Sequence, residues 1–276
     1  MIYQMLTSTF MQHAFIGAFL ASLACGLIGP FVVVKRIGYI AGGISHAVLG
    51  GVGLALFFHQ NPMYGAIIFS ILAALLIGFV SIHLKQYEDV MISALWSFGM
   101  AIGIIFISKT PGYQTDLMSY LFGNILMISI KELYLILGID LLLILFLVIT
   151  YKKLISICFD QEFAYVRGVN TSFYYMLLLC MIALTCVVLI QIVGLILVIA
   201  LLSLPAASIK PQALSIKQMI FYASGIGVLS SFTGLILAYF LNVPAGSMII
   251  LVVVMIFFLS VFVRRKKTLP SKVSIS

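Results

Sequence analysis

Apolar runs long enough to cross a membrane, separated only by short polar breaks, occupy nearly all of the 276-residue sequence. One crossing helix requires about 20 apolar residues, and no segment long enough for a soluble domain is left between the runs. The pattern predicts an all-α, polytopic membrane helix bundle with eight or nine transmembrane helices. It forms a single transmembrane domain over 1–263, followed by a basic cytoplasmic tail over 264–276. The predicted runs are 13–34, 40–58, 62–83, 90–108, 131–151, 173–192, 193–209, 218–241 and 244–263.

The few charges indicate how the helices are oriented. Only 8% of residues are charged, against about 25% in a soluble domain, and the basic ones gather in alternate breaks and in the terminal RRKK at 264–267. Because cytoplasmic loops carry an excess of Lys and Arg, we expect a multi-pass protein of the plasma membrane with its N-terminus outside and its C-terminus inside. The net charge of +8 is therefore interpreted as a topology signal, and no nucleic-acid partner is expected.

The sequence offers little that could perform catalysis. It contains only seven acidic residues, nearly all in the breaks, and lacks both H-E-x-x-H and G-x-x-x-x-G-K-[ST], which would bind a catalytic zinc or nucleotide phosphates. The four cysteines show no C-x-x-C spacing and are interpreted as small buried hydrophobes. We therefore expect no enzyme activity, and if the protein pumps a solute, the energy must come from another chain.

His46 is the ionisable side chain that we identify deep inside an apolar run, in the segment GGISHAVLGGVGLAL. A polar group without a partner is costly in hydrocarbon, so the ring must face protein or water. Gly42 and Gly50 fall one turn away on the same helical face, with Ser45 beside them, and glycines allow helices to approach closely. Two interpretations remain open: a histidine that serves packing alone, or a metal ligand on a pathway lined by Gly42, Ser45 and Gly50.

Two further histidines and one carboxylate fall near the predicted outer surface. His13, His59 and Asp116 could together collect cations at an outer mouth, since imidazole and carboxylate groups both bind divalent metal ions. The alternative is that all three are solvated loop residues.

The segment RIGYIAGGISHAVLGGVGLAL is similar to the S-H-A segment of the metal-ion permease family of ATP-binding-cassette importers, which move zinc, manganese or iron inward. Further matches follow in family order: ALWSFGMAIGIIFI, DLMSYLFGNIL, FDQEFAYVRGV, VGLILVIALLSLPAAS and VPAGSMIILV. The resemblance implies a homodimer around one central pathway, a separate cytoplasmic ATPase and an extracytoplasmic metal-binding protein. It also implies that His46 is a transient ligand for the transported ion, with no permanently bound cofactor.

Position 42 differs from the pattern that the resemblance implies for the family. Many members carry an aspartate four residues before the histidine, where this chain has Gly42. A site with a single neutral nitrogen per subunit should bind its ion less tightly and discriminate differently. Two copies of His46 in a dimer would compensate in part.

The segment FDQEFAYVRGV is the longest polar interruption of the chain. It resembles the E-x-A-x-x-x-G coupling loop of importer permeases, in which a short helix docks into a cleft on the ATPase. The coupling residues implied are Asp160, Glu162, Ala164, Arg167 and Gly168; the alternative is a solvated connector.

Other functions remain open at this point. An importer permease of related build could carry a metal chelate or vitamin. A channel or secondary carrier independent of ATP is a different class.

Overall fold

The computed structural model describes residues 8–110, 121–210, 213 and 215–267, and over these ranges it is a bundle of α-helices with short 3₁₀ turns and no strand. Eight helices are long and apolar enough to cross a membrane: α2 (Thr9–Lys35), α3 (Gly38–Phe57), α4 (Pro62–His83), α5 (Glu88–Lys109, preceded by η1 Lys85–Tyr87), α7 (Ile130–Phe159), α9 (Thr171–Val193), α11 (Ile216–Leu241) and α12 (Ala245–Lys267). The remaining elements are η2 (Ile125–Met127), α8 (Gln161–Val166), η3 (Leu195–Leu197) and α10 (Val198–Ile209). The predicted fold class is confirmed.

The run at 193–209 is the one that does not form a long helix. Gly194 ends α9 with φ +81°, a conformation that favours glycine, and the chain continues as η3 and the 12-residue α10. A Cβ at Gly194 would lie 2.3 Å from the backbone nitrogen of Gly123. This close approach packs the turn after α9 against the segment that precedes η2.

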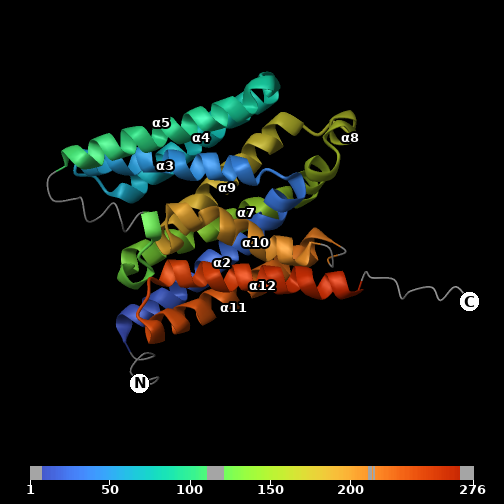
Figure 1. Ribbon diagram of the computed structural model, residues 1–276. Coiled ribbons are helices and arrows are strands. Elements are labelled where there is room, and N and C mark those ends of the chain that lie inside the picture. The colour runs from blue at the N-terminus through green and yellow to red at the C-terminus, as the bar shows by residue number, and fades with distance from the viewer. Residues whose placement is uncertain (1–7, 111–120, 211–212, 214, 268–276) are drawn as a thin grey trace, which may run out of the picture.

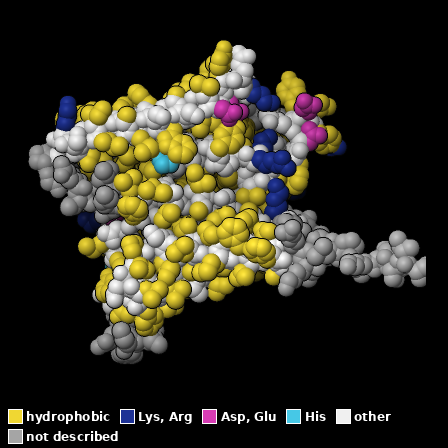
Figure 2. All heavy atoms as spheres, viewed as in Figure 1, with side chains coloured by type: hydrophobic (Ala, Val, Ile, Leu, Met, Phe, Trp, Pro, Cys, Tyr) yellow, Lys and Arg dark blue, Asp and Glu magenta, His cyan; other side chains and the backbone are white. Residues whose placement is uncertain are grey.

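Helices α2, α3 and α9 form the buried centre, whereas α5, α11 and α12 have most of their residues at the surface. In Figure 1, α3, α4 and α5 lie together on one side, α11 and α12 lie on the other, and α2, α7 and α10 lie between them. Figure 2 shows hydrophobic side chains over much of the visible face of the bundle, with many of the visible charges gathered toward one end. This distribution suits a body in contact with lipid and ends in contact with water.

The glycines of α3 set its distance from α5. A Cβ at Gly53 would lie 2.5 Å from the carbonyl oxygen of Gly103, and one at Gly99 would lie 2.4 Å from Cα of Ala47. Neither distance leaves room for a side chain, so the two backbones are in contact, as small residues permit between membrane helices. The glycine pattern around His46 therefore serves this packing.

Candidate functional site

His46 lies on α3 in the interior of the bundle, with 9% of its surface exposed. Its ring is stacked on that of Trp96 from α5, with the ring centroids 4.0 Å apart and the planes 11° from parallel. Its Nδ1 atom is buried and has no hydrogen-bond partner. The ring is thus packed against a neighbouring ring while Nδ1 is left unpaired, and a neutral imidazole in this setting can offer a lone pair to a borderline metal ion.

The residues predicted to line a pathway with His46 are Gly42, Ser45 and Gly50, and all three lie with it on α3. A Cβ at Gly42 would lie 2.7 Å from Cδ1 of Ile199 and 3.6 Å from the ring of Trp96, so side chains of α10 and α5 fill that space. Ser45 is buried and donates its hydroxyl to the carbonyl oxygen of Gly42 at 2.9 Å. A Cβ at Gly50 would lie 3.1 Å from the carbonyl oxygen of Gly99.

The predicted cation-collecting residues occupy separate elements. His13, on α2, places Nδ1 3.2 Å from the carbonyl oxygen of Ile128, and His59 follows α3 in an exposed turn with φ 53°. Asp116 lies outside the described residues. Within the described ranges, no three His, Cys, Asp or Glu side chains are grouped so that they could hold a metal ion.

The coupling segment folds as the short helix α8. Asp160 begins it by accepting the backbone N–H of Phe163 at 2.9 Å, and Ala164 faces inward with no exposed surface. The opposite face presents Tyr165 and Val166, which are 72% and 83% exposed. Exposed apolar side chains on a short polar-flanked helix are suited to burial against a partner protein.

Beyond α8 the chain reverses through a short turn. The guanidinium of Arg167 lies 4.8 Å from the centre of the Phe163 ring, a cation–π distance. Gly168 adopts φ +78°, and nothing surrounds its Cβ position within 4 Å. The glycine is therefore favoured by the backbone conformation and not by lack of space.

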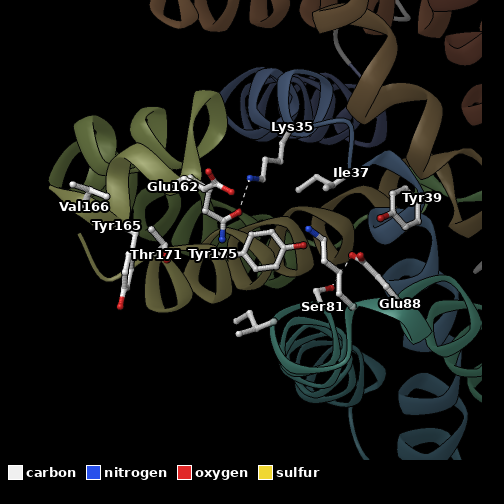
Figure 3. A pocket seen from close by; sticks show the side chains of 13 residues that line it. Lys35, Ile37, Tyr39, Ser81, Glu88, Glu162, Tyr165, Val166, Thr171 and Tyr175 are labelled. Atoms are coloured by element: carbon white, nitrogen blue, oxygen red, sulfur yellow. Dashed lines mark hydrogen bonds between the residues drawn. The ribbon is translucent and has the colours of Figure 1, made fainter. Parts of the chain in front are cut away.

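A pocket of about 580 Å³ lies beside α8, where α2, α3, α4, α5 and α9 have their ends (Figure 3). Lys35, the last residue of α2, donates Nζ to the carbonyl oxygen of Ile157 at 2.9 Å and to Oε1 of Gln161 on α8 at 3.1 Å. Ser81 donates to Glu88 across the same pocket at 2.7 Å. A movement of α8 therefore reaches α2 directly, and α3, which carries His46, begins only three residues after α2 ends.

Sequence patterns alone do not identify two residues of functional interest: Trp96, which is 36% exposed, and Asp140, which is buried. Trp96 lies within an apolar run, and a helix pattern does not show which neighbour its ring will face. The interpretation of His46 as the one deep ionisable group was wrong, since Asp140 lies inside α7 with 1% of its surface exposed. Its position in the middle of the run 131–151 was the available signal.

The bundle of apolar helices, the unpartnered histidine inside it and the exposed short helix at its end together define the membrane-spanning subunit of a transporter. A family model described as the ABC 3 transport family matches residues 7–264, and the chain belongs to this family. The resemblance to metal-ion permeases of ATP-binding-cassette importers is thereby confirmed, and the protein is a transport component.

Individual relatives match over nearly their whole length. An uncharacterized membrane protein of Synechocystis sp. is 44% identical over 95% of this chain and 93% of its own. The manganese import system permease protein ScaB of Streptococcus gordonii is 36% identical over 94% of this chain and 92% of its own. The solved structure of PsaBC from Streptococcus pneumoniae in complex with Fab matches with a TM-score of 0.86 and 34% identity, covering 95% of this chain and 96% of that one.

Proposed function

We propose that this chain is the membrane-spanning subunit of an ATP-driven importer for a divalent transition metal ion: zinc, manganese or iron. The protein works as a homodimer in the plasma membrane, with its N-terminus outside and its C-terminus inside. An extracytoplasmic metal-binding protein delivers the ion, and a separate cytoplasmic ATPase powers alternating access. The observation that carries the proposal is the buried, unpartnered Nδ1 of His46 in a chain of this family.

His46 acts as a transient ligand in this mechanism. A transport site must bind its ion well enough to accept it and weakly enough to release it, and one imidazole per subunit meets that requirement. Gly42 supplies no oxygen ligand, and imidazole suits zinc and iron as well as it suits copper and nickel, so manganese is only one of the candidate ions despite the name of the streptococcal relative. His13, His59 and Asp116 stay candidates for collecting cations at the outer mouth.

The ATPase docks on α8 in this proposal. The exposed side chains of Tyr165 and Val166 enter its cleft, Glu162 and Arg167 flank the contact, and Lys35 transmits the displacement to α2. Replacement of Glu162 by Gln or of Gly168 by Ala should weaken co-purification of the ATPase or uncouple its hydrolysis from uptake. Unchanged assembly and unchanged transport in both variants would refute the docking assignment.

The test of the proposal is uptake by the reconstituted complex. Proteoliposomes that contain the permease, its ATPase and the binding protein are supplied with labelled zinc, manganese or iron, with and without ATP. His46→Ala should abolish uptake of the cognate ion while the complex still assembles. His83→Ala is the matched control, because His83 is exposed at the end of α4. Full uptake by an assembled His46→Ala complex would remove this residue from the pathway, and uptake by the permease alone would indicate a channel or secondary carrier.

A further inference from the structure

The structure places a carboxyl group inside the subunit, at a position that the proposed transport site does not use. Asp140 lies on α7, about 15 Å along the helix axis from Ile130, the first residue of the helix, at 1.5 Å per residue. Only 1% of its surface is exposed. Neither carboxyl oxygen has a hydrogen-bond partner. Among the buried side-chain nitrogen and oxygen atoms of the described residues, only Nδ1 of His46 likewise lacks a hydrogen-bond partner.

The basic groups of the helices packed against α7 do not reach this carboxyl. Helix α7 packs against α2, α9 and α8. On α2, His13 contacts Ile128, which precedes α7, and Lys35 donates to Ile157, about 25 Å beyond Asp140 along the helix. Lys153, on α7 itself, donates to the hydroxyl of Tyr174 on α9. These contacts hold the basic groups at the two ends of α7.

A thiol lies within electrostatic range of Asp140. Cys25 of α2 is buried and within electrostatic range of both Asp140 and Cys186 of α9. Cys186 in turn directs Sγ toward the carbonyl oxygen of Ala41 on α3, 3.7 Å away. The other titratable groups on the packed helices are Tyr174, Tyr175 and Cys180 of α9 and Glu162 and Tyr165 of α8. None of these groups carries a positive charge, so none can neutralise a carboxylate.

An isolated carboxylate in a low-dielectric interior is far less stable than its neutral form, and such a group takes up a cation instead. The cation could be a metal ion or a proton. A transported ion can be held transiently by few ligands, as proposed for His46, but a metal ion resident inside one subunit requires several. The described residues assemble no group of three His, Cys, Asp or Glu side chains for a resident ion. A proton requires only the carboxyl itself.

We propose that Asp140 is a proton-binding site inside each subunit, and that its proton stabilises the packing of α7 against α2 and α9 seen in this conformation. Loss of the proton to water leaves an unpaired negative charge among these helices. Rising pH therefore loosens their packing, and falling pH restores it. The proposal does not depend on which ion the permease carries, since it concerns a group outside the His46 site.

Infrared difference spectroscopy of the purified permease tests the proposal directly. Wild type minus Asp140→Asn should show the carbonyl stretch of a protonated carboxylic acid at neutral pH. Asp89→Asn is the matched control, because Asp89 is exposed at the start of α5, and its difference spectrum should lack this band. If Asp140→Asn does not accumulate, aspartate-selective ¹³C labelling of the wild type should shift the same band.

Thermal unfolding gives an independent measurement. A group that ionises more readily in the unfolded chain lowers stability as pH rises, so the Tm of the wild type should fall by a few degrees more than that of Asp140→Asn between mildly acidic and mildly alkaline pH. Asp89→Asn should follow the wild type. Absence of the carboxylic acid band, or equal pH dependence in wild type and Asp140→Asn, would overturn the proposal. So would a stoichiometric metal ion that co-purifies with wild type and is lost in Asp140→Asn, because it would make this a metal site.

Discussion

Introducing a carboxylate at position 42 should change which metal ion the protein prefers. Residues 42 and 46 are one turn apart on the same face of α3, so an aspartate at 42 would place an oxygen ligand beside the imidazole of His46. Oxygen ligands suit manganese better than imidazole does. Mutation of residues that only hydrogen-bond to metal ligands changes metal affinity about 10- to 100-fold. A direct oxygen ligand should have at least this effect, so we expect the manganese-to-zinc uptake ratio to rise by at least about tenfold.

The structure also predicts that Gly42→Asp alone will be destabilising. The new Cβ would lie 2.7 Å from Cδ1 of Ile199, about 0.7 Å closer than the van der Waals range begins. Because Cδ1 is the end of a flexible side chain and can move away, the cost should fall at the lower end of the about 1–3 kcal/mol typical of overpacking. Ile199→Ala removes the obstructing atoms. The loss of half-buried methyl and methylene groups should cost about 1–2 kcal/mol by itself, at about 0.8 kcal/mol per fully buried group. We therefore expect Gly42→Asp/Ile199→Ala to be more stable than the sum of the two single effects.

Competitive uptake of labelled manganese and zinc by the reconstituted double variant provides the assay, with Tm measured on the same preparations. Gly42→Asn/Ile199→Ala is the matched control, since it fills the same space without the charge. Adding His46→Ala to the double variant should abolish the gain. An assembled double variant whose uptake ratio equals that of the Asn control would refute the reasoning, because the carboxylate would then not reach the ion bound by His46.

Three further predictions follow from the packing and the charge pattern. Trp96→Leu removes a stacked ring worth about 0.5–1.5 kcal/mol, so the KM for metal uptake should rise about 2- to 10-fold at unchanged kcat. Trp96→Phe should give a KM between those of the wild type and Trp96→Leu. An unchanged KM would contradict the positioning of His46 by Trp96. Gly53→Val should lower Tm sharply, because its Cβ would lie 2.5 Å from a backbone oxygen of α5. The control Gly225→Ala, whose Cβ would have nothing within 4 Å, should leave Tm unchanged or raise it. Equal effects of the two substitutions on Tm would argue against contact between α3 and α5. In a cysteine-free background, a cysteine at position 112 should react with an impermeant reagent added outside sealed cells and one at position 266 should not, and the reverse result would invert the proposed topology.

The site could be predicted from the sequence only in part. His46 was identified because a deep ionisable group is unusual in any apolar run, and α8 was identified because it is a polar break with a recognisable spacing. Trp96 and Ile199 could not be assigned to the same site, since they lie 50 and 153 residues from His46 in the sequence. Asp140 carried the same signal, an ionisable side chain in the middle of an apolar run, but its full enclosure could not be predicted because it depends on how α2 and α9 pack against α7.

The apolar runs alone predict a bundle of membrane-spanning helices. Insertion of a segment into a bilayer depends on its own composition, and each backbone N–H and C=O must be satisfied within its own helix. Which faces of the helices meet depends on how the helices pack in three dimensions. The stacking of His46 on Trp96, the filling of Gly42 by Ile199 and the enclosure of Asp140 all follow from contacts between helices that are separated in sequence. In lipid such contacts are selected by close packing of side chains rather than by hydrophobicity, and the pattern of apolar residues carries little information about them.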